Sequence, residues 1–234
     1  MSKITTTNFP QGVTNAAIGS VLQGFGDADP TVFHQYFNDF DTFNAGDWTG
    51  TATGAAANAV TAGDGGLLGM VNSAANNDLD SLQLKAASFA FVAGQQAWIK
   101  TRFSLSSATN AALTIGLIQT TTTPLVVTDG LYLSKAAAST QLTAKVAKAS
   151  AISSVNIGAM ADATFIVVGI HVNVDEQVAK VYVNGNKVAQ LLLTNLPVAN
   201  LNLTMAVANG TAAANTLTVD YIHVATERPS TQNN

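Results

Sequence analysis

Hydrophobic and polar residues alternate clearly over residues 178–193. Ala179, Val181 and Val183 fall on one side of an extended strand, because successive side chains of a strand point to opposite faces. The alternation breaks at Asn184-Gly185, and both residue types tolerate the positive φ angles of a tight turn between twisted strands. The pattern therefore predicts a β-hairpin whose second strand fills the rest of this range.

Residues 96–105 show the best alternation in the chain and predict a long strand. One side of this strand consists of Ala97, Ile99, Thr101, Phe103 and Leu105. The other side consists of Trp98, Lys100, Arg102 and Ser104. Residues 165–174 predict a second long strand with a continuous apolar face. In the hairpin, Lys180 and Tyr182 lie opposite the apolar side and are expected at the surface.

The remaining strands are short and evenly spaced. An opening strand is expected within residues 36–43, which are dense in aromatic side chains. Further strands are expected near residues 48–53, 57–62, 67–71, 79–84, 88–91, 111–119, 130–133, 140–146, 152–157, 201–208 and 216–224. About a dozen strands without a long helix are typical of an all-β sandwich or barrel. We therefore predict an antiparallel β-sandwich over residues 31–228.

Residues 1–30 differ from the rest and are predicted to form an N-terminal arm. Within them, Ile18, Val21, Leu22 and Phe25 have the spacing of one face of a short helix. This face, together with Phe9, is the expected partner-binding surface of the arm. Two interpretations stay open: the segment folds back onto its own sandwich, or it docks on a neighbouring subunit. Residues 229–234 are expected to form a polar C-terminal tail.

The composition narrows the classes of partner. Apolar residues make up 47% of the 234 residues, enough for a large core, whereas charged residues make up only 10%, compared with roughly 25% in an average soluble domain. A neutral surface suits a protein that lives in an assembly, and it also fits a Thr- and Asn-rich secreted sandwich. The net charge of −4 and the scattered basic residues argue against nucleic-acid binding.

Other sequence features exclude further kinds of site and partner. Without cysteine, the chain has neither disulfides nor thiolate metal sites. The first residues lack the apolar core of a signal peptide, and no run reaches the length of a membrane span. We therefore expect no membrane partner.

The order of several short motifs resembles the concanavalin A-like, or laminin-G-like, jelly roll of tailed-phage virion proteins. The matching segments are Phe37-Asn38-Asp39-Phe40, Trp98-Ile99-Lys100-Thr101-Arg102-Phe103, Ile115-Gly116-Leu117, Asp129-Gly130-Leu131-Tyr132, Val181-Tyr182-Val183-Asn184-Gly185, Leu196-Pro197 and Leu217-Thr218-Val219-Asp220-Tyr221-Ile222. The resemblance covers roughly residues 32–228. It implies a decoration or cement protein that sits on a capsid while an arm reaches neighbouring subunits.

The sequence offers little support for catalysis. Sandwich glucanases display Glu-x-Asp-x-Glu on one strand, because hydrolysis needs two carboxylates facing each other across a cleft. This chain contains only two glutamates, Glu176 at a predicted turn and Glu227 near the tail, so we expect no enzyme. A serine nucleophile of the form Gly-x-Ser-x-Gly is also missing.

Metal binding is not expected either. His34, His171 and His223 lack the spacing of metal ligands, and we expect His171 to face solvent on its strand. Asp39, Asp41 and Asp47 lie near the opening strand, but calcium needs six to eight converging oxygens. We therefore predict no cofactor.

The face formed by Trp98, Lys100 and Arg102 has two interpretations. An aromatic ring beside basic groups can stack a sugar, but such a face more often packs against another layer or a partner. The sequence thus yields two functional hypotheses. The first is a capsid decoration protein of the virion surface, made in the host cytoplasm, with the major capsid protein and copies of itself as partners. The alternative is a carbohydrate- or receptor-binding sandwich of a head or tail fibre.

Overall fold

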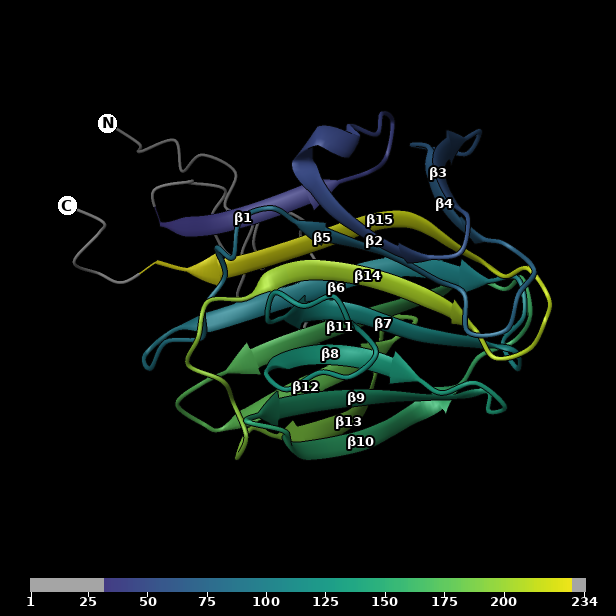
Figure 1. Cartoon of the computed structure of the whole chain (residues 1–234). Coiled ribbons are helices and arrows are strands. Elements are labelled where there is room, and N and C mark those ends of the chain that lie inside the picture. The colour runs from purple at the N-terminus through teal and green to yellow at the C-terminus, as the bar shows by residue number, and fades with distance from the viewer. Residues whose placement is uncertain (1–31, 229–234) are drawn as a thin grey trace, which may run out of the picture.

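The computed structural model describes residues 32–228, which form two packed antiparallel sheets (Figure 1). The eight-stranded sheet has the order β13-β12-β11-β6-β15-β4-β3, and β1 also pairs with β15. The seven-stranded sheet has the order β10-β9-β8-β7-β14-β5-β2. Within the described residues the single helix is the 3-10 turn η1 (Ala45–Asp47). The predicted all-β antiparallel sandwich is therefore confirmed.

The strand boundaries follow the alternation in the sequence closely. The eight-stranded sheet consists of β1 (Phe33–Asn38), β3 (Ala56–Thr61), β4 (Leu67–Asn72), β6 (Gln96–Leu105), β11 (Ile166–Asn173), β12 (Val178–Val183), β13 (Asn186–Leu192) and β15 (Thr216–Glu227). The seven-stranded sheet consists of β2 (Trp48–Thr53), β5 (Leu79–Leu84), β7 (Ala111–Ile118), β8 (Gly130–Lys135), β9 (Gln141–Lys148), β10 (Ala151–Ala159) and β14 (Asn202–Asn209).

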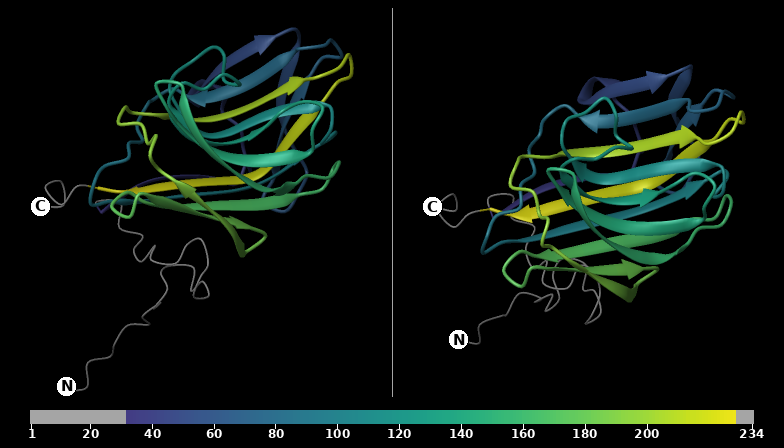
Figure 2. Two further views of the ribbon diagram at one scale, coloured as in Figure 1. Left: turned by 90° about the horizontal axis from the view of Figure 1, so that it is seen from below. Right: turned by 60° about the horizontal axis from the view of Figure 1, so that its bottom comes forward.

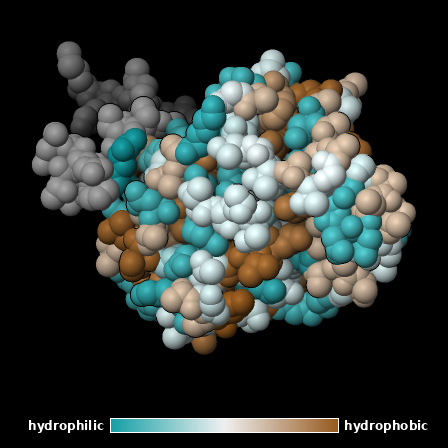
Figure 3. Space-filling view, viewed as in Figure 1, coloured by the Kyte–Doolittle hydropathy of each residue, from teal (hydrophilic) through white to brown (hydrophobic). Residues whose placement is uncertain are grey.

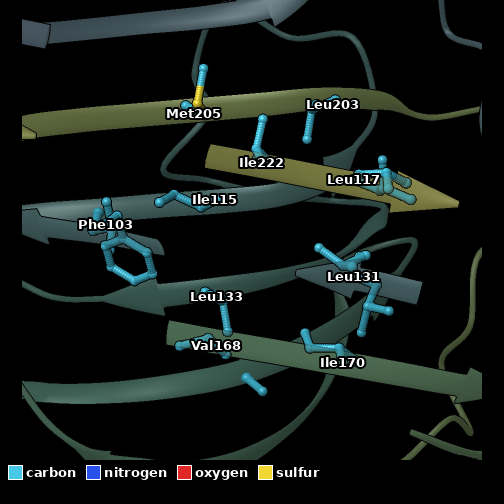
Figure 4. Close-up of a cluster of buried hydrophobic side chains, with 14 of the residues drawn as sticks. Phe103, Ile115, Leu117, Leu131, Leu133, Val168, Ile170, Leu203, Met205 and Ile222 are labelled. Atoms are coloured by element: carbon cyan, nitrogen blue, oxygen red, sulfur yellow. The ribbon is translucent and has the colours of Figure 1, made fainter. Parts of the chain in front are cut away.

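The core fills the space between the two sheets, whose strands bend (Figure 2). Figure 4 shows side chains of both sheets in this space, among them Phe103 of β6, Leu117 of β7 and Ile170 of β11. The predicted apolar sides of β6 and β11 supply many of these residues. At one side of the sandwich the edge strands β10 and β13 contact each other.

The hairpin of β12 and β13 forms as predicted. Asn184 and Gly185 make the turn with φ angles of 49° and 83°, which are positive as a tight hairpin turn requires. The prediction that Tyr182 is exposed is wrong, because its side chain is 4% exposed. It belongs to a small cluster with Phe33, Trp98 and Ala225 on the side of the eight-stranded sheet that faces away from the core.

Two further predictions need correction. The opening strand is β1, which ends at Asn38 because the Asn38 side-chain oxygen accepts a hydrogen bond of 2.8 Å from the Phe40 N–H. Phe40 then adopts a φ of 53° and turns into the core. Residues 88–91 form no strand beyond a single bridge between Phe89 and Leu201.

The long strand β15 holds the eight-stranded sheet together. Along one edge it pairs with β6; along the other it pairs first with β4 and then with β1. A bulge between Val219 and Tyr221 inserts Asp220 as an extra residue. The bulge directs the Asp220 carboxylate to Arg102, at 2.5 Å from its guanidinium.

Candidate binding site

The loop of residues 119–129, between β7 and β8, packs on the face of the seven-stranded sheet that points away from the core. We call this face the outer face. The two ends of the loop are joined, because the Gln119 N–H donates to the Asp129 carbonyl at 2.9 Å. The Asp129 N–H donates in turn to the Gln119 side-chain oxygen at 3.1 Å. The loop therefore leaves and re-enters the sheet at neighbouring points.

Two buried amide side chains of the sheet hold this loop in place. Gln83 of β5 donates to the Gln119 carbonyl at 3.3 Å and accepts from the Thr121 N–H at 3.1 Å. Its amide also donates to the Thr204 hydroxyl of β14 at 2.8 Å. The Thr120 hydroxyl donates to the Asn202 side-chain oxygen at 2.7 Å. Buried polar groups are costly when unpaired, so these bonds favour one loop conformation.

The loop also has an apolar underside. Val127 packs with Ile118, Tyr132 and Ala147 on the outer face, and all four are buried. The preceding residue, Val126, is 69% exposed and points away from this cluster. Figure 3 shows hydrophobic residues on the visible face of the molecule as small patches between polar and neutral ones.

A pocket of about 270 Å³ lies between this loop and strands β2, β5 and β14. We call it the loop pocket. Its lining consists of Thr53, Asn77, Leu79, Thr122, Thr123, Pro124, Leu125, Val126 and Ala208. The lining combines the hydroxyl and amide side chains of threonine and asparagine with aliphatic side chains. No charged side chain is among these residues, so the loop pocket suits a neutral ligand with both hydroxyl and C–H surfaces.

A second pocket of about 240 Å³ lies beside β1 and the end of β15. Its ionisable groups already have structural partners. The Glu227 carboxylate accepts a hydrogen bond of 2.7 Å from the Gln96 N–H, and the His34 ring stacks on Phe89 with centroids 4.5 Å apart. We therefore take the loop pocket as the candidate site.

The face formed by Trp98, Lys100 and Arg102 is not an open platform on which a sugar could stack. Trp98 is completely buried, and its ring stacks on His171 with centroids 5.3 Å apart and planes 4° from parallel. Lys100 lies over the Tyr221 ring at 5.8 Å, and Arg102 lies over the Phe165 ring at 4.1 Å. With its ring covered in this way, Trp98 offers no open surface to a sugar in this conformation.

The histidines on this face are half-buried rather than solvent-facing. Burial, reinforced by Lys180, lowers the pKa of His171 to about 4, although Glu176 opposes the shift. His171 also shares a hydrogen bond of 2.6 Å with the Gln96 side chain. Burial, with a smaller effect of Lys100, lowers the pKa of His223 to about 4. Both rings are therefore neutral at physiological pH.

Neither glutamate lies on the seven-stranded sheet. Glu176 is in the predicted turn between β11 and β12, and Glu227 is the last residue of β15. Among residues 32–228 no group of three or more His, Asp or Glu side chains could hold a metal ion. Nor does any helix in this part of the chain have the length and apolar character to cross a membrane.

The predicted arm residues Phe9, Ile18, Val21, Leu22 and Phe25 lie outside the described residues, as does the predicted tail. The loop pocket was not found from the sequence, because its lining comes from four separate segments without a motif. The signal that could have indicated it is the run of threonines before Pro124, which marks a polar loop.

Comparison with known proteins places the fold among the concanavalin A-like jelly rolls. The sequence matches no protein-family model and no curated protein. Among solved structures, the carbohydrate recognition domain of Emp47p aligns over 85% of this chain and 98% of its own, with 13% identity and a TM-score of 0.57. An endo-1,3-beta-glucanase from Streptomyces sioyaensis aligns over 87% and 100%, with 13% identity and a TM-score of 0.58.

A protein of unknown function from Shewanella oneidensis MR-1 is also similar, over 84% of this chain and 87% of its own, with 14% identity and a TM-score of 0.60. Because one fold hosts a carbohydrate recognition domain and a glucanase alike, these matches establish the architecture.

Proposed function

We propose that this protein is a carbohydrate-binding sandwich module without enzymatic activity and that it takes a neutral sugar in the loop pocket. The observation that carries the proposal is the uncharged lining, which combines hydroxyl, amide and aliphatic side chains. The shared fold with a carbohydrate recognition domain supports it.

The chemistry of the lining matches that of a sugar. Thr53 and Thr122 carry hydroxyls, and Asn77 carries an amide, so each can both donate and accept hydrogen bonds with sugar hydroxyls. The side chains of Leu79 and Val126 can cover the C–H face of the ring. A volume of about 270 Å³ suits a single sugar unit better than a long chain.

The same lining argues against glycoside hydrolysis. This reaction uses a carboxylic acid and a carboxylate on either side of the glycosidic bond. None of the residues that line the loop pocket has a side chain that can donate or accept a proton near neutral pH. The proposed role is therefore binding alone.

A glycan array tests the proposal. The protein is expected to bind neutral glycans, and Asn77→Gly and Thr53→Val are expected to weaken binding at least tenfold because each removes a hydrogen-bonding group from the lining. Glycine accepts the φ of 65° at position 77, and valine has the shape of threonine. Asn186→Ala, in the exposed hairpin, is the matched control. Equal binding by all four proteins would place the sugar elsewhere.

The capsid-decoration hypothesis is the second proposal. It is favoured by the sequence resemblance and by the charged fraction of only 10%, which suits burial in an assembly. None of the three solved structures named above is a virion protein by its name. Deleting residues 1–30 is expected to reduce occupancy on capsids, measured by quantitative gel analysis of purified particles. Undiminished occupancy would contradict the hypothesis that residues 1–30 bind a neighbouring subunit.

A further inference from the structure

The turn of residues 73–78 connects the two sheets and carries Asn77 to the loop pocket. It runs from the end of β4 to the start of β5. Asn77 adopts a φ of 65°, a left-handed conformation that asparagine tolerates better than most residues. Within the turn, the Asp78 N–H donates to the Ala75 carbonyl at 3.4 Å and the Ser73 hydroxyl donates to the Asp78 carboxylate. Neither bond involves Asn77, so the position of Asn77 depends on what lies behind the turn.

Behind this turn lies Asn209, the last residue of β14, which is only 2% exposed. Its side-chain amide donates to the Ser73 carbonyl at 2.5 Å and to the Ala75 carbonyl at 2.9 Å. Its side-chain oxygen accepts from the amides of Asn72 at 3.3 Å and Asn215 at 3.0 Å. All four hydrogen-bonding positions of the Asn209 side chain are therefore occupied.

The backbone of Asn209 holds the same turn. The Asn77 N–H donates to the Asn209 carbonyl at 2.9 Å, and the Asn209 N–H donates to the Asp78 carbonyl at 2.9 Å. Four hydrogen bonds thus join this one residue to the turn, two from its side chain and two through its backbone. The same strand end supplies Ala208 to the lining of the loop pocket.

We infer that Asn209 is a positioning residue that fixes Asn77 at the loop pocket and thereby sets the affinity for the sugar. It does not line the pocket and acts only through the turn. The inference rests on the proposed sugar-binding function as far as affinity is concerned, whereas the positioning of the turn can be tested without a ligand.

Asparagine is the side chain that this position requires. Aspartate has the same shape but no N–H groups, so it would place an oxygen against the carbonyls of Ser73 and Ala75. In Asn209→Asp the amide exchange of residues 73–78, measured on the full chain by hydrogen–deuterium exchange, is expected to rise at least tenfold. The control is Asn195→Asp, which makes the same substitution at a side chain that donates to the Ser153 hydroxyl at 3.0 Å, far along the sequence from the turn. The Ser153 hydroxyl can donate to the new carboxylate, so this variant adds the same charge while keeping a partner.

Asn215→Ala covers the case in which Asn209→Asp does not fold. Asn215 donates to the Asn209 side chain, and its other hydrogen bonds go to Ala213 and to the Asn72 N–H rather than to residues 73–78. Its loss is expected to raise the exchange of the turn several-fold. Unchanged exchange in the folded variants would overturn the inference.

Saturation-transfer NMR then reports on affinity, with methyl α-glucoside, methyl α-mannoside and methyl β-N-acetylglucosaminide as probes. The probe that binds the wild type is expected to bind Asn209→Asp at least tenfold more weakly and Asn215→Ala several-fold more weakly. It is expected to bind Asn195→Asp as well as it binds the wild type. If no probe binds the wild type, the proposed function fails while the exchange data still decide the positioning role. Wild-type affinity in a variant whose turn exchanges faster would overturn the link between the turn and binding.

Discussion

Replacing Gly116 by alanine is expected to lower the free energy of unfolding by about 2–4 kcal/mol. Gly116 lies in β7, between β14 and β8 of the seven-stranded sheet. A Cβ atom there would meet the Leu131 carbonyl oxygen at 2.5 Å and the Tyr132 Cα at 2.6 Å. Both are backbone atoms of the neighbouring strand, so they can move only by distorting the sheet.

The backbone conformation adds to this cost, because Gly116 has a φ of 154° that residues with a Cβ rarely adopt. Urea denaturation of the full chain measures the effect. Gly50→Ala in β2 is the control, since the nearest atom to its added Cβ would be the Ser81 carbonyl oxygen at 3.9 Å. If both variants lose the same free energy of unfolding, the contact of the added Cβ with the backbone of β8 is not the cause.

Replacing Asp80 by asparagine is expected to stabilise the protein at pH 8 by about 1–3 kcal/mol. Asp80 lies in the interior between the sheets and is 1% exposed. One of its carboxylate oxygens accepts a hydrogen bond of 3.3 Å from the Asn58 amide. The other Asp80 oxygen and the Asn58 side-chain oxygen are buried without a hydrogen-bond partner.

A proton on Asp80 would satisfy both of these oxygens. The protonated carboxyl can donate to the Asn58 oxygen while accepting from the Asn58 amide, and an asparagine at position 80 can make the same two bonds. Burial raises the pKa of Asp80, although the Asn58 hydrogen bond opposes the shift. Because the folded pKa is above the unfolded value, the contribution of Asp80 to stability is fully present below the unfolded pKa. It is lost as the pH rises through the folded pKa.

Asp80→Asn removes this loss, so its gain over the wild type is expected at pH 8 and should shrink toward pH 4. Chemical denaturation at the two pH values measures the difference. Asp41→Asn, which makes the same substitution at an exposed position, is the control. A gain of equal size at both pH values would contradict the protonation argument.

Local signals predicted the fold well. The hairpin turn at Asn184-Gly185 and the alternating strand over residues 96–105 are determined by backbone conformation and by the two faces of a strand, which neighbouring residues specify. The opening strand was misplaced because the side chain of Asn38 ends it before Phe40, and a run of aromatic residues does not reveal such a turn.

The candidate site was harder to predict, because burial on the outer side of a sheet depends on what packs there. Alternation correctly placed Trp98 and Tyr182 on the face away from the core. It could not show that both side chains are buried there, in a separate cluster with Phe33 and Ala225. The lining of the loop pocket is neutral and comes from segments as distant as Thr53 and Ala208. No charge, motif or spacing marks such a set in a linear sequence.

The pairing of β15 has a consequence for how the chain folds. Residues 33–38 pair with residues 222–227 of β15, and β4 and β6 also pair with β15. Contacts of such long sequence separation slow folding, because a large loop must close before any of them forms. During synthesis, the eight-stranded sheet cannot be completed until its final described strand has left the ribosome. Until then, strands β1, β4 and β6 depend on protection from premature pairing with other chains.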